Sequence, residues 1–259
     1  SRHTPSTISA VFFPATPVTV VRGRGEMYPL NGPSWSLFFE YIGNVLYALF
    51  IHKFSTRALA LLVFAAGCGL AAFAILGPYG DICAGFSLTG TEITAGFLRL
   101  MFSFSAGLLL FRMFKPARVK GAFWICSLSI VVLLSVPRLG GAENLWMNGL
   151  YDTVCFALFF PLLVYLGASG KTTDKYTTRI CNFLGDISYP LYMVHYPFIY
   201  LYYAWVMNEE LTFWESFPVA LGVVAGSIVL AYVCLRWYDI PVRKYQIGRF
   251  LKPRNSVKG

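Results

Sequence analysis

A row of polar residues lies just after Pro33, in a stretch of sequence that is otherwise apolar. Ser36, Glu40 and Asn44 follow one another at intervals of four residues, so they share one face if the stretch is a helix. A carboxylate inside a lipid bilayer is costly unless it faces a partner or a water-filled cavity. Trp35 marks the membrane interface and Glu40 lies more than one turn beyond it, so the pattern favours a functional site. The alternative is a carboxylate close enough to the membrane surface to remain hydrated.

A second row of polar residues includes a histidine. Ser188, Tyr192 and His195 are separated by four and three residues, so they also share one helix face. Asp186 or Ser188 is expected to cap this helix, with Pro190 in its first turn, which places His195 near the middle of the membrane. A neutral imidazole there can hold a hydroxyl group or act as a base. A packed, hydrogen-bonded structural histidine is equally consistent with the pattern.

Two more ionisable residues lie inside apolar runs. Arg99 is about two turns, and Asp152 about one turn, from the predicted outer ends of their spans. Together with Glu40 they predict one polar cavity that opens to the outside of the membrane. The alternative is that Arg99 and Asp152 form a purely structural ion pair.

The composition identifies the kind of protein that must position these residues. The 259 residues are 57% hydrophobic and 13% charged, whereas soluble domains carry about 25% charged residues. Several apolar runs approach the roughly 20 residues that cross a bilayer as a helix. The predicted fold is an all-α polytopic transmembrane helix bundle with about seven spans, at residues 35–51, 58–77, 93–114, 120–137, 146–168, 187–207 and 214–238.

The distribution of charge predicts the topology. Lys and Arg gather in alternate loops and at the end of the chain, as they do on the cytoplasmic face of membrane proteins. Residues 1–34 are therefore expected to be an extracytoplasmic loop, 35–242 the bundle in the plasma membrane, and 243–259 a basic cytoplasmic tail. The net charge of +9 is explained by this topology, so no nucleic-acid partner is predicted. The cysteines are scattered, which predicts neither a metal site nor a disulfide framework.

Four segments, in order along the chain, resemble the membrane-bound acyltransferase-3 family, the O-antigen and exopolysaccharide O-acetylase type. Residues 31–40, NGPSWSLFFE, resemble its PPSWSLxxE signature, and residues 99–107 resemble its helix with Arg followed by Phe-x-x-Gly. Residues 187–197, ISYPLYMVHYP, are the most specific match. Residues 238–244 resemble its closing E-x-P-x-R end, with Asp239 in place of Glu.

The resemblance implies an integral-membrane O-acyltransferase. Such enzymes move an acyl group, commonly acetyl from cytoplasmic acetyl-CoA, to a sugar hydroxyl of a cell-surface glycan or lipid-linked saccharide. Acyl-CoA would be a donor co-substrate, and no tightly bound cofactor is expected. The family has about ten spans of roughly 20 residues each and carries its catalytic histidine on the first. The sequence is therefore expected to be the C-terminal part of the bundle, lacking that histidine and inactive alone.

The resemblance also suggests roles for individual residues. Glu40 would orient the family's histidine or bind the sugar, Arg99 would stabilise developing negative charge, and His195 would complete the catalytic group. The acceptor would be bound by Ser34, Trp35, Ser36, Asn44, Asp152, Ser188 and Tyr192. Two alternatives remain open: a transporter or exporter of a small acid or lipid-linked sugar, and a non-catalytic member of the family.

Overall fold

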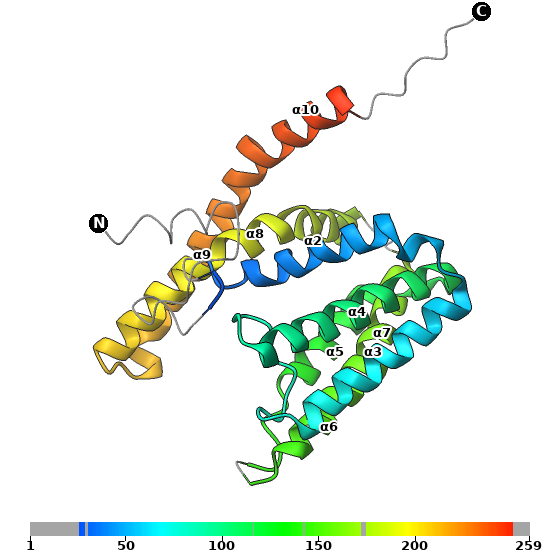
Figure 1. Ribbon diagram of the computed structural model, residues 1–259. Coiled ribbons are helices and arrows are strands. Elements are labelled where there is room, and N and C mark those ends of the chain that lie inside the picture. The colour runs from blue at the N-terminus through cyan, green and yellow to red at the C-terminus, as the bar shows by residue number, and fades with distance from the viewer. Residues whose placement is uncertain (1–25, 29–30, 116, 142, 172–174, 251–259) are drawn as a thin grey trace, which may run out of the picture. The chain divides into compact units, whose positions relative to one another are not determined.

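The computed structural model describes residues 26–28, 31–115, 117–141, 143–171 and 175–250 (Figure 1). These residues form helices, apart from short connections, one isolated bridge and a pair of two-residue parallel strands, β1 (Val119–Lys120) and β2 (Gly170–Lys171). The predicted all-helical class is confirmed for this part of the chain. The chain divides into two compact units, residues 1–175 and 176–259, and each is described by itself.

The first unit is a group of helices connected by short loops. Its helices are α2 (Ser34–Leu49), the 3₁₀ turn η1 (Ile51–Lys53), α3 (Thr56–Leu76), α4 (Gly90–Met113), α5 (Ala122–Leu134), α6 (Leu145–Val154), the π-helical segment η2 (Cys155–Phe159) and α7 (Phe160–Ala168). Helix α3 packs against α4 and α6, α2 packs against α4, and α5 packs against α7. One core cluster consists of Ala66, Leu70, Phe102 and Phe156, and a second of Met27, Phe39 and Leu100.

Local sequence explains where the two long helices of this unit begin. The Ser55 hydroxyl accepts a hydrogen bond from the Ala58 amide at 3.2 Å, and the Thr89 hydroxyl accepts one from the Glu92 amide at 3.4 Å. Both are N-cap interactions that satisfy an amide with no partner inside the helix. They fix the residues at which α3 and α4 begin. They therefore also fix which side chains of α4 lie beside α2.

Helices α3 and α6 approach each other closely at Gly149. A Cβ atom built on Gly149 would lie 2.0 Å from the Ala74 carbonyl oxygen, so only glycine allows the two backbones to come this close. We expect Gly149→Ala to lower the free energy of unfolding by about 1–3 kcal/mol, the usual cost of overpacking. Thermal unfolding in detergent measures the effect. Gly107→Ala is the control, because a Cβ there meets nothing within 4 Å; equal destabilisation by both variants would contradict the close crossing.

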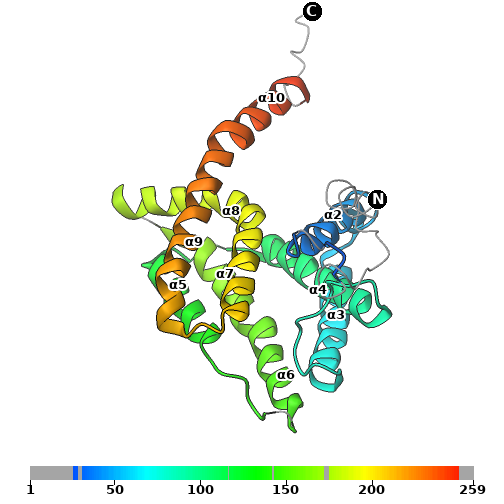
Figure 2. The ribbon, with the colours of Figure 1, turned by 90° about the vertical axis from the view of Figure 1, so that its left-hand side faces the viewer.

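The second unit is a helical hairpin that continues into a long helix. Helix α8 (Lys175–Asn208) is followed by α9 (Phe213–Cys234), the π-helical segment η3 (Leu235–Asp239) and α10 (Ile240–Phe250). Figure 2 shows α9 and α10 as one continuous helix. In the turn before α9, Thr212 and Glu215 form a capping box, with the Thr212 amide 2.8 Å from the Glu215 carboxylate. The Tyr202 hydroxyl donates to the Ser216 carbonyl oxygen at 3.4 Å and connects α8 to α9.

Each π-helical segment ends two residues before a proline. Segment η2 precedes Pro161, and η3 precedes Pro241. Proline has no amide hydrogen, and its ring collides with the carbonyl group four residues earlier in an α-helix. The wider π turn gives this carbonyl room, so both helices continue through the proline instead of ending there.

The number of membrane spans is only partly confirmed. Among the described residues, four helices are long and apolar enough to cross a membrane: Thr56–Leu76, Gly90–Met113, Leu145–Ala168 and Phe213–Arg249. They correspond to four of the seven predicted spans. The predicted spans 35–51 and 120–137 are the shorter helices α2 and α5, of 16 and 13 residues. The predicted span 187–207 lies inside α8, a helix of 34 residues.

One predicted helix start also differs. The helix that carries His195 begins at Lys175, so the predicted cap at Asp186 or Ser188 is wrong; the Ser188 hydroxyl donates within the helix to the Gly185 carbonyl oxygen at 2.8 Å. Helix α10 runs through the predicted start of the tail at residue 243. Residues 1–25 and 251–259 of the predicted loop and tail lie outside the described residues.

Candidate functional site

Helices α2 and α4 enclose a pocket of 410 Å³. Five residues of the predicted site line it: Trp35, Ser36, Glu40 and Asn44 from α2, and Arg99 from α4. The remaining lining residues are Phe39, Gly96, Leu100, Ser103 and Phe104. The row of residues at intervals of four and the arginine of a distant segment thus reach one pocket, which we call the α2–α4 pocket.

Small residues allow the two helices to meet beside this pocket. A Cβ atom on Gly96 would lie 2.3 Å from the Phe39 ring, and one on Gly43 would lie 2.8 Å from the Leu100 side chain. Phe39 and Gly43 are the buried residues of α2. Glu40 follows Phe39 directly, so packing of Phe39 against Gly96 places Glu40 at the edge of the helix contact.

The Glu40 carboxylate is available to a ligand. Its side chain is exposed, and within the described part of the chain it has no hydrogen bond or ion pair. Its two neighbours in the row have partners in their own helix region: the Asn44 amide donates to the Glu40 carbonyl oxygen at 2.9 Å, and the Ser36 hydroxyl donates to the Pro33 carbonyl oxygen at 3.0 Å. An unpaired carboxylate can accept a hydrogen bond, or a proton, from a hydroxyl group.

Arg99 supplies the opposite charge and is held in place. Its Nη1 donates to the Ala84 carbonyl oxygen at 2.7 Å. The guanidinium carbon lies 4.7 Å from the centroid of the Trp35 ring, a cation–π contact. A planar guanidinium fixed on both sides presents its charge in a defined direction, so the α2–α4 pocket can stabilise negative charge that develops on a bound group.

The loop between α3 and α4 positions both Arg99 and Trp35. Gly85 has a φ of +113°, and a Cβ atom there would lie 2.9 Å from the Trp35 ring and 3.0 Å from the Gly96 Cα. The loop therefore lies directly against the ring on which Arg99 stacks. Phe86, the next residue of the loop, is also held in place, because the Met27 amide donates to the Phe86 carbonyl oxygen at 2.7 Å.

Glu92 holds this loop through hydrogen bonds to its backbone. Its side chain is 3% exposed, and its carboxylate accepts hydrogen bonds from the Gly85 amide at 2.6 Å and the Phe86 amide at 3.3 Å. No role for Glu92 was predicted from the sequence. The Thr89-x-x-Glu92 spacing is that of a helix N-terminus, but it gives no sign that the carboxylate binds a loop seven residues earlier. Glu92 is therefore a positioning residue that sequence reasoning missed.

Removing the Glu92 carboxylate is expected to loosen the site. Glu92→Ala leaves the Gly85 and Phe86 amides without their acceptor, and a buried unpaired group costs about 1–3 kcal/mol. We expect a lower melting temperature in detergent. Glu92→Gln keeps one acceptor oxygen and is expected to lose less stability. Equal melting temperatures for Glu92→Ala and the unmodified protein would show that the carboxylate does not hold the loop.

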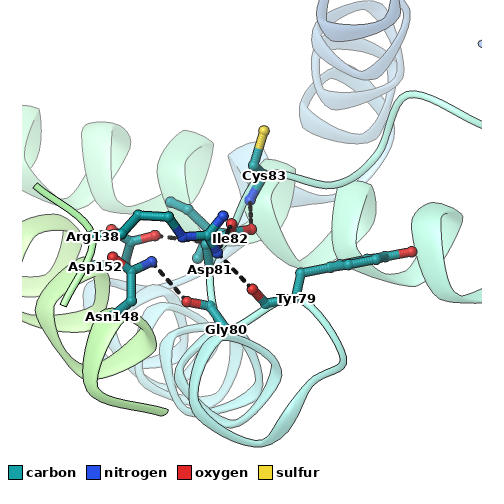
Figure 3. Close-up of polar contacts among 8 residues, drawn as sticks. All are labelled: Tyr79, Gly80, Asp81, Ile82, Cys83, Arg138, Asn148 and Asp152. Atoms are coloured by element: carbon teal, nitrogen blue, oxygen red, sulfur yellow. Dashed lines mark hydrogen bonds and ion pairs between the residues drawn. The ribbon is translucent and has the colours of Figure 1, made fainter. Parts of the chain in front are cut away.

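Asp152 lies in a different network, shown in Figure 3. Its carboxylate accepts a hydrogen bond from the Ile82 amide at 3.2 Å. Nearby, Arg138 pairs with Asp81 at 2.9 Å, and the Asn148 amide donates to the Gly80 carbonyl oxygen at 2.8 Å. Asp152 does not line the α2–α4 pocket, so the structure does not bring Glu40, Arg99 and Asp152 into the single predicted cavity. Asp152 instead ties α6 to the loop after α3.

The other predicted residues occupy separate places. Ser34 begins α2, where its amide donates to the Asn31 carbonyl oxygen at 3.0 Å, and it does not line the pocket. Ser188, Tyr192 and His195 lie on α8, in the second unit. The His195 Nδ1 atom is 3.0 Å from the Leu191 carbonyl oxygen and 2.9 Å from that of Tyr192. Because carbonyl oxygens only accept, Nδ1 carries the hydrogen, and Nε2 of a neutral ring is left as an acceptor.

A comparison with protein families identifies the relatives of this chain. The model of the acyltransferase domain that defines the acyltransferase-3 family matches residues 4–236. The chain belongs to the acyltransferase-3 family. Curated proteins and solved structures gave no match.

The segments that resemble the acyltransferase-3 family lie on helices in the structure. Residues 31–40 lead into α2, and residues 99–107 form the middle of α4, so the first two segments line the α2–α4 pocket together. Residues 187–197 lie within α8. In the last segment Asp239 forms an ion pair with Arg243 one turn later.

Proposed function

We propose that this member of the acyltransferase-3 family is an integral-membrane O-acyltransferase that moves an acetyl or another acyl group from acyl-CoA to a sugar hydroxyl of a cell-surface glycan or a lipid-linked saccharide. The observation that carries the proposal is the α2–α4 pocket, where a fixed Arg99 guanidinium shares one lining with a Glu40 carboxylate that has no partner among the described residues. A hydroxyl group that becomes a nucleophile needs an acceptor for its proton and a positive charge for the oxyanion.

Each group of the pocket has a role in the proposed reaction. The acceptor hydroxyl oxygen bonds to the thioester carbonyl carbon, its proton passes to a base, and the carbon–sulfur bond breaks to release the CoA thiolate. Glu40 binds the hydroxyl or orients the family's histidine base, and Arg99 stabilises the negative charge on the tetrahedral intermediate. Trp35, Ser36 and Asn44 line the space for the sugar. His195 on α8 is a candidate for a second base, because the hydrogen bonds of its Nδ1 atom leave Nε2 of the neutral ring as an acceptor.

The distribution of charge in the first unit supports a donor on the cytoplasmic side and an acceptor outside. Asp81 and Glu143 lie in loops at one end of the helices, whereas Lys115 and Lys171 lie at the other. Because Lys and Arg gather on the cytoplasmic face of membrane proteins, this distribution supports a cytoplasmic position for the cation-rich end and an outside position for Asp81 and Glu143. The cation-rich end suits the phosphates of a CoA donor.

Transfer of labelled acetyl groups tests the proposal. Membranes from cells that express the complete gene receive acetyl-CoA labelled in the acetyl group, and the surface glycans are then analysed by mass spectrometry. We expect the label on a glycan hydroxyl, as an ester that mild base removes. Label that stays in acetyl-CoA, with unchanged glycans in cells that carry or lack the gene, would contradict the function.

A further inference from the structure

The first unit contains a second polar pocket, on the other side of the loop that holds Arg99. Its volume is 780 Å³, within the usual range for ligand sites. The loop after α3, the start of α4 and the residues Arg138, Gly141 and Leu145 form it. Its lining includes Tyr79, Asp81, Ser87, Thr89 and Arg138. We call it the loop pocket.

The charges of the loop pocket are already matched within the protein. Asp81 pairs with Arg138 at 2.9 Å, and the Glu92 carboxylate binds the Gly85 and Phe86 amides. A charged ligand would have to compete with these partners, whereas a neutral ligand with many hydroxyl groups can add hydrogen bonds to the same atoms. Ser87 and Thr89 add two hydroxyl groups to the lining.

Tyr79 gives the loop pocket an apolar face. Its side chain is 41% exposed, so part of the ring is open to a ligand. The Glu92 carboxylate, by hydrogen bonding and charge, raises the pKa of Tyr79 above its usual value, and the phenol stays neutral. A flat aromatic surface beside hydroxyl groups suits a sugar ring, which has apolar C–H faces and polar edges.

The loop pocket and the α2–α4 pocket lie along the same helix. Glu92 lines the first and Gly96 lines the second, one turn of α4 apart, or about 6 Å along its axis. Cys83 and Phe86 face the loop pocket, whereas Ala84 and Gly85 contact Arg99 and Trp35. A ligand in the loop pocket would therefore touch the loop that fixes the catalytic arginine.

We propose that the loop pocket is a second carbohydrate subsite, which binds a neutral sugar residue of the acceptor next to the one that is acylated. This inference rests on the proposed function for the identity of the ligand. It accounts for a large polar pocket, with its charges matched internally, close to Glu40 and Arg99.

Protection of Cys83 from alkylation tests the subsite without a need for activity. The Cys83 side chain is exposed and lines the loop pocket. The complete protein in detergent is alkylated with iodoacetamide, with and without oligosaccharides released from the surface glycan of the source cells, and the Cys83 peptide is followed by mass spectrometry. We expect the oligosaccharides to slow alkylation of Cys83. The thiol introduced by Ser135→Cys, exposed at the same end of the unit, should react at an unchanged rate.

Variants of Tyr79 connect the protection to the pocket wall. Tyr79→Ala is expected to remove the protection and raise the acceptor KM roughly tenfold at unchanged kcat, as loss of uniform binding does. Tyr79→Phe keeps the ring and should keep both properties. Tyr176→Ala, at a tyrosine that is 82% exposed in the second unit, is the matched control.

The outcomes separate the subsite from the proposed function. Acyl transfer to the oligosaccharides without protection of Cys83 would overturn the subsite and leave the function standing. Protection without acyl transfer would support the subsite and count against the function. Protection by inorganic phosphate or spermidine, but not by the oligosaccharides, would overturn the proposed ligand class.

Discussion

Replacement of Glu40 by glutamine is expected to lower acyl transfer by the complete protein about 100-fold or more, the usual contribution of a group that accepts or directs a proton. The amide has nearly the shape of the carboxylate but carries no charge and accepts no proton. Because no hydrogen bond or ion pair of the described residues involves the Glu40 carboxylate, the melting temperature should not change. The initial rate of labelled acetyl transfer in membranes measures the effect.

Two controls make the Glu40→Gln result specific. Glu209→Gln removes an exposed carboxylate from the turn after α8 that has no role in the proposed reaction, and it should leave the rate unchanged. Glu40→Asp keeps the charge on a shorter side chain and should retain more activity than Glu40→Gln. A Glu40→Gln protein with the rate of the unmodified protein would remove Glu40 from the mechanism.

Replacement of Arg99 by lysine is expected to lower kcat by roughly 10²–10³, the cost of losing one group that stabilises an oxyanion. Lysine keeps the positive charge but loses the planar fork. It therefore cannot both bind the Ala84 carbonyl oxygen and stack on Trp35 as the guanidinium does. The loss should fall on kcat more than on the acceptor KM, since the charge is needed most in the transition state.

Arg112→Lys is the matched control for Arg99→Lys. Arg112 is also on α4 and also donates to a backbone carbonyl oxygen, that of Phe54, at 2.6 Å, but it is exposed near the opposite end of the helix. Kinetics with labelled donor over a range of acceptor concentrations distinguish the two positions. Equal losses for both variants would mean that Arg99 acts through the stability of α4 and not through the pocket.

The α2–α4 pocket could be predicted in part because its residues follow helical periodicity. Ser36, Glu40 and Asn44 are neighbours on one helix face wherever that helix lies, and the cost of a charge in an apolar run marked Arg99 as well. What the sequence did not contain is the packing that joins the two helices, which depends on Phe39 fitting against Gly96.

The residues that support the pocket were harder to predict for a physical reason. Glu92 and Asp152 hold backbone amides of the loop after α3, and such bonds depend on the path of the loop in space. A carboxylate that binds a substrate and one that binds a backbone amide have the same sequence signature. Asp152 was therefore assigned to the acceptor and Glu92 was given no role, whereas both hold the loop.

The predicted start of α8 is wrong because a proline was interpreted as marking the first turn of the helix. Pro190 suggested the first turn of a helix, but α8 begins at Lys175 and contains both Pro190 and Pro197. Long membrane helices tolerate proline when neighbouring groups satisfy the freed carbonyl groups. The π-helical segments before Pro161 and Pro241 accommodate proline in another way, by a local change in helix width, which no periodicity of side chains reveals.

The proposed reaction requires the Glu40 carboxylate to border a hydrated pocket and to contact the hydroxyl group that is acylated. A cryo-electron microscopy structure of the complete protein in a lipid nanodisc, with the surface oligosaccharide bound, is the decisive test. We expect a sugar hydroxyl within hydrogen-bond distance of the Glu40 carboxylate, about 2.5–3.0 Å, with the Arg99 guanidinium on the same side of the sugar. A Glu40 side chain surrounded by lipid acyl chains, with the sugar bound elsewhere, would contradict it.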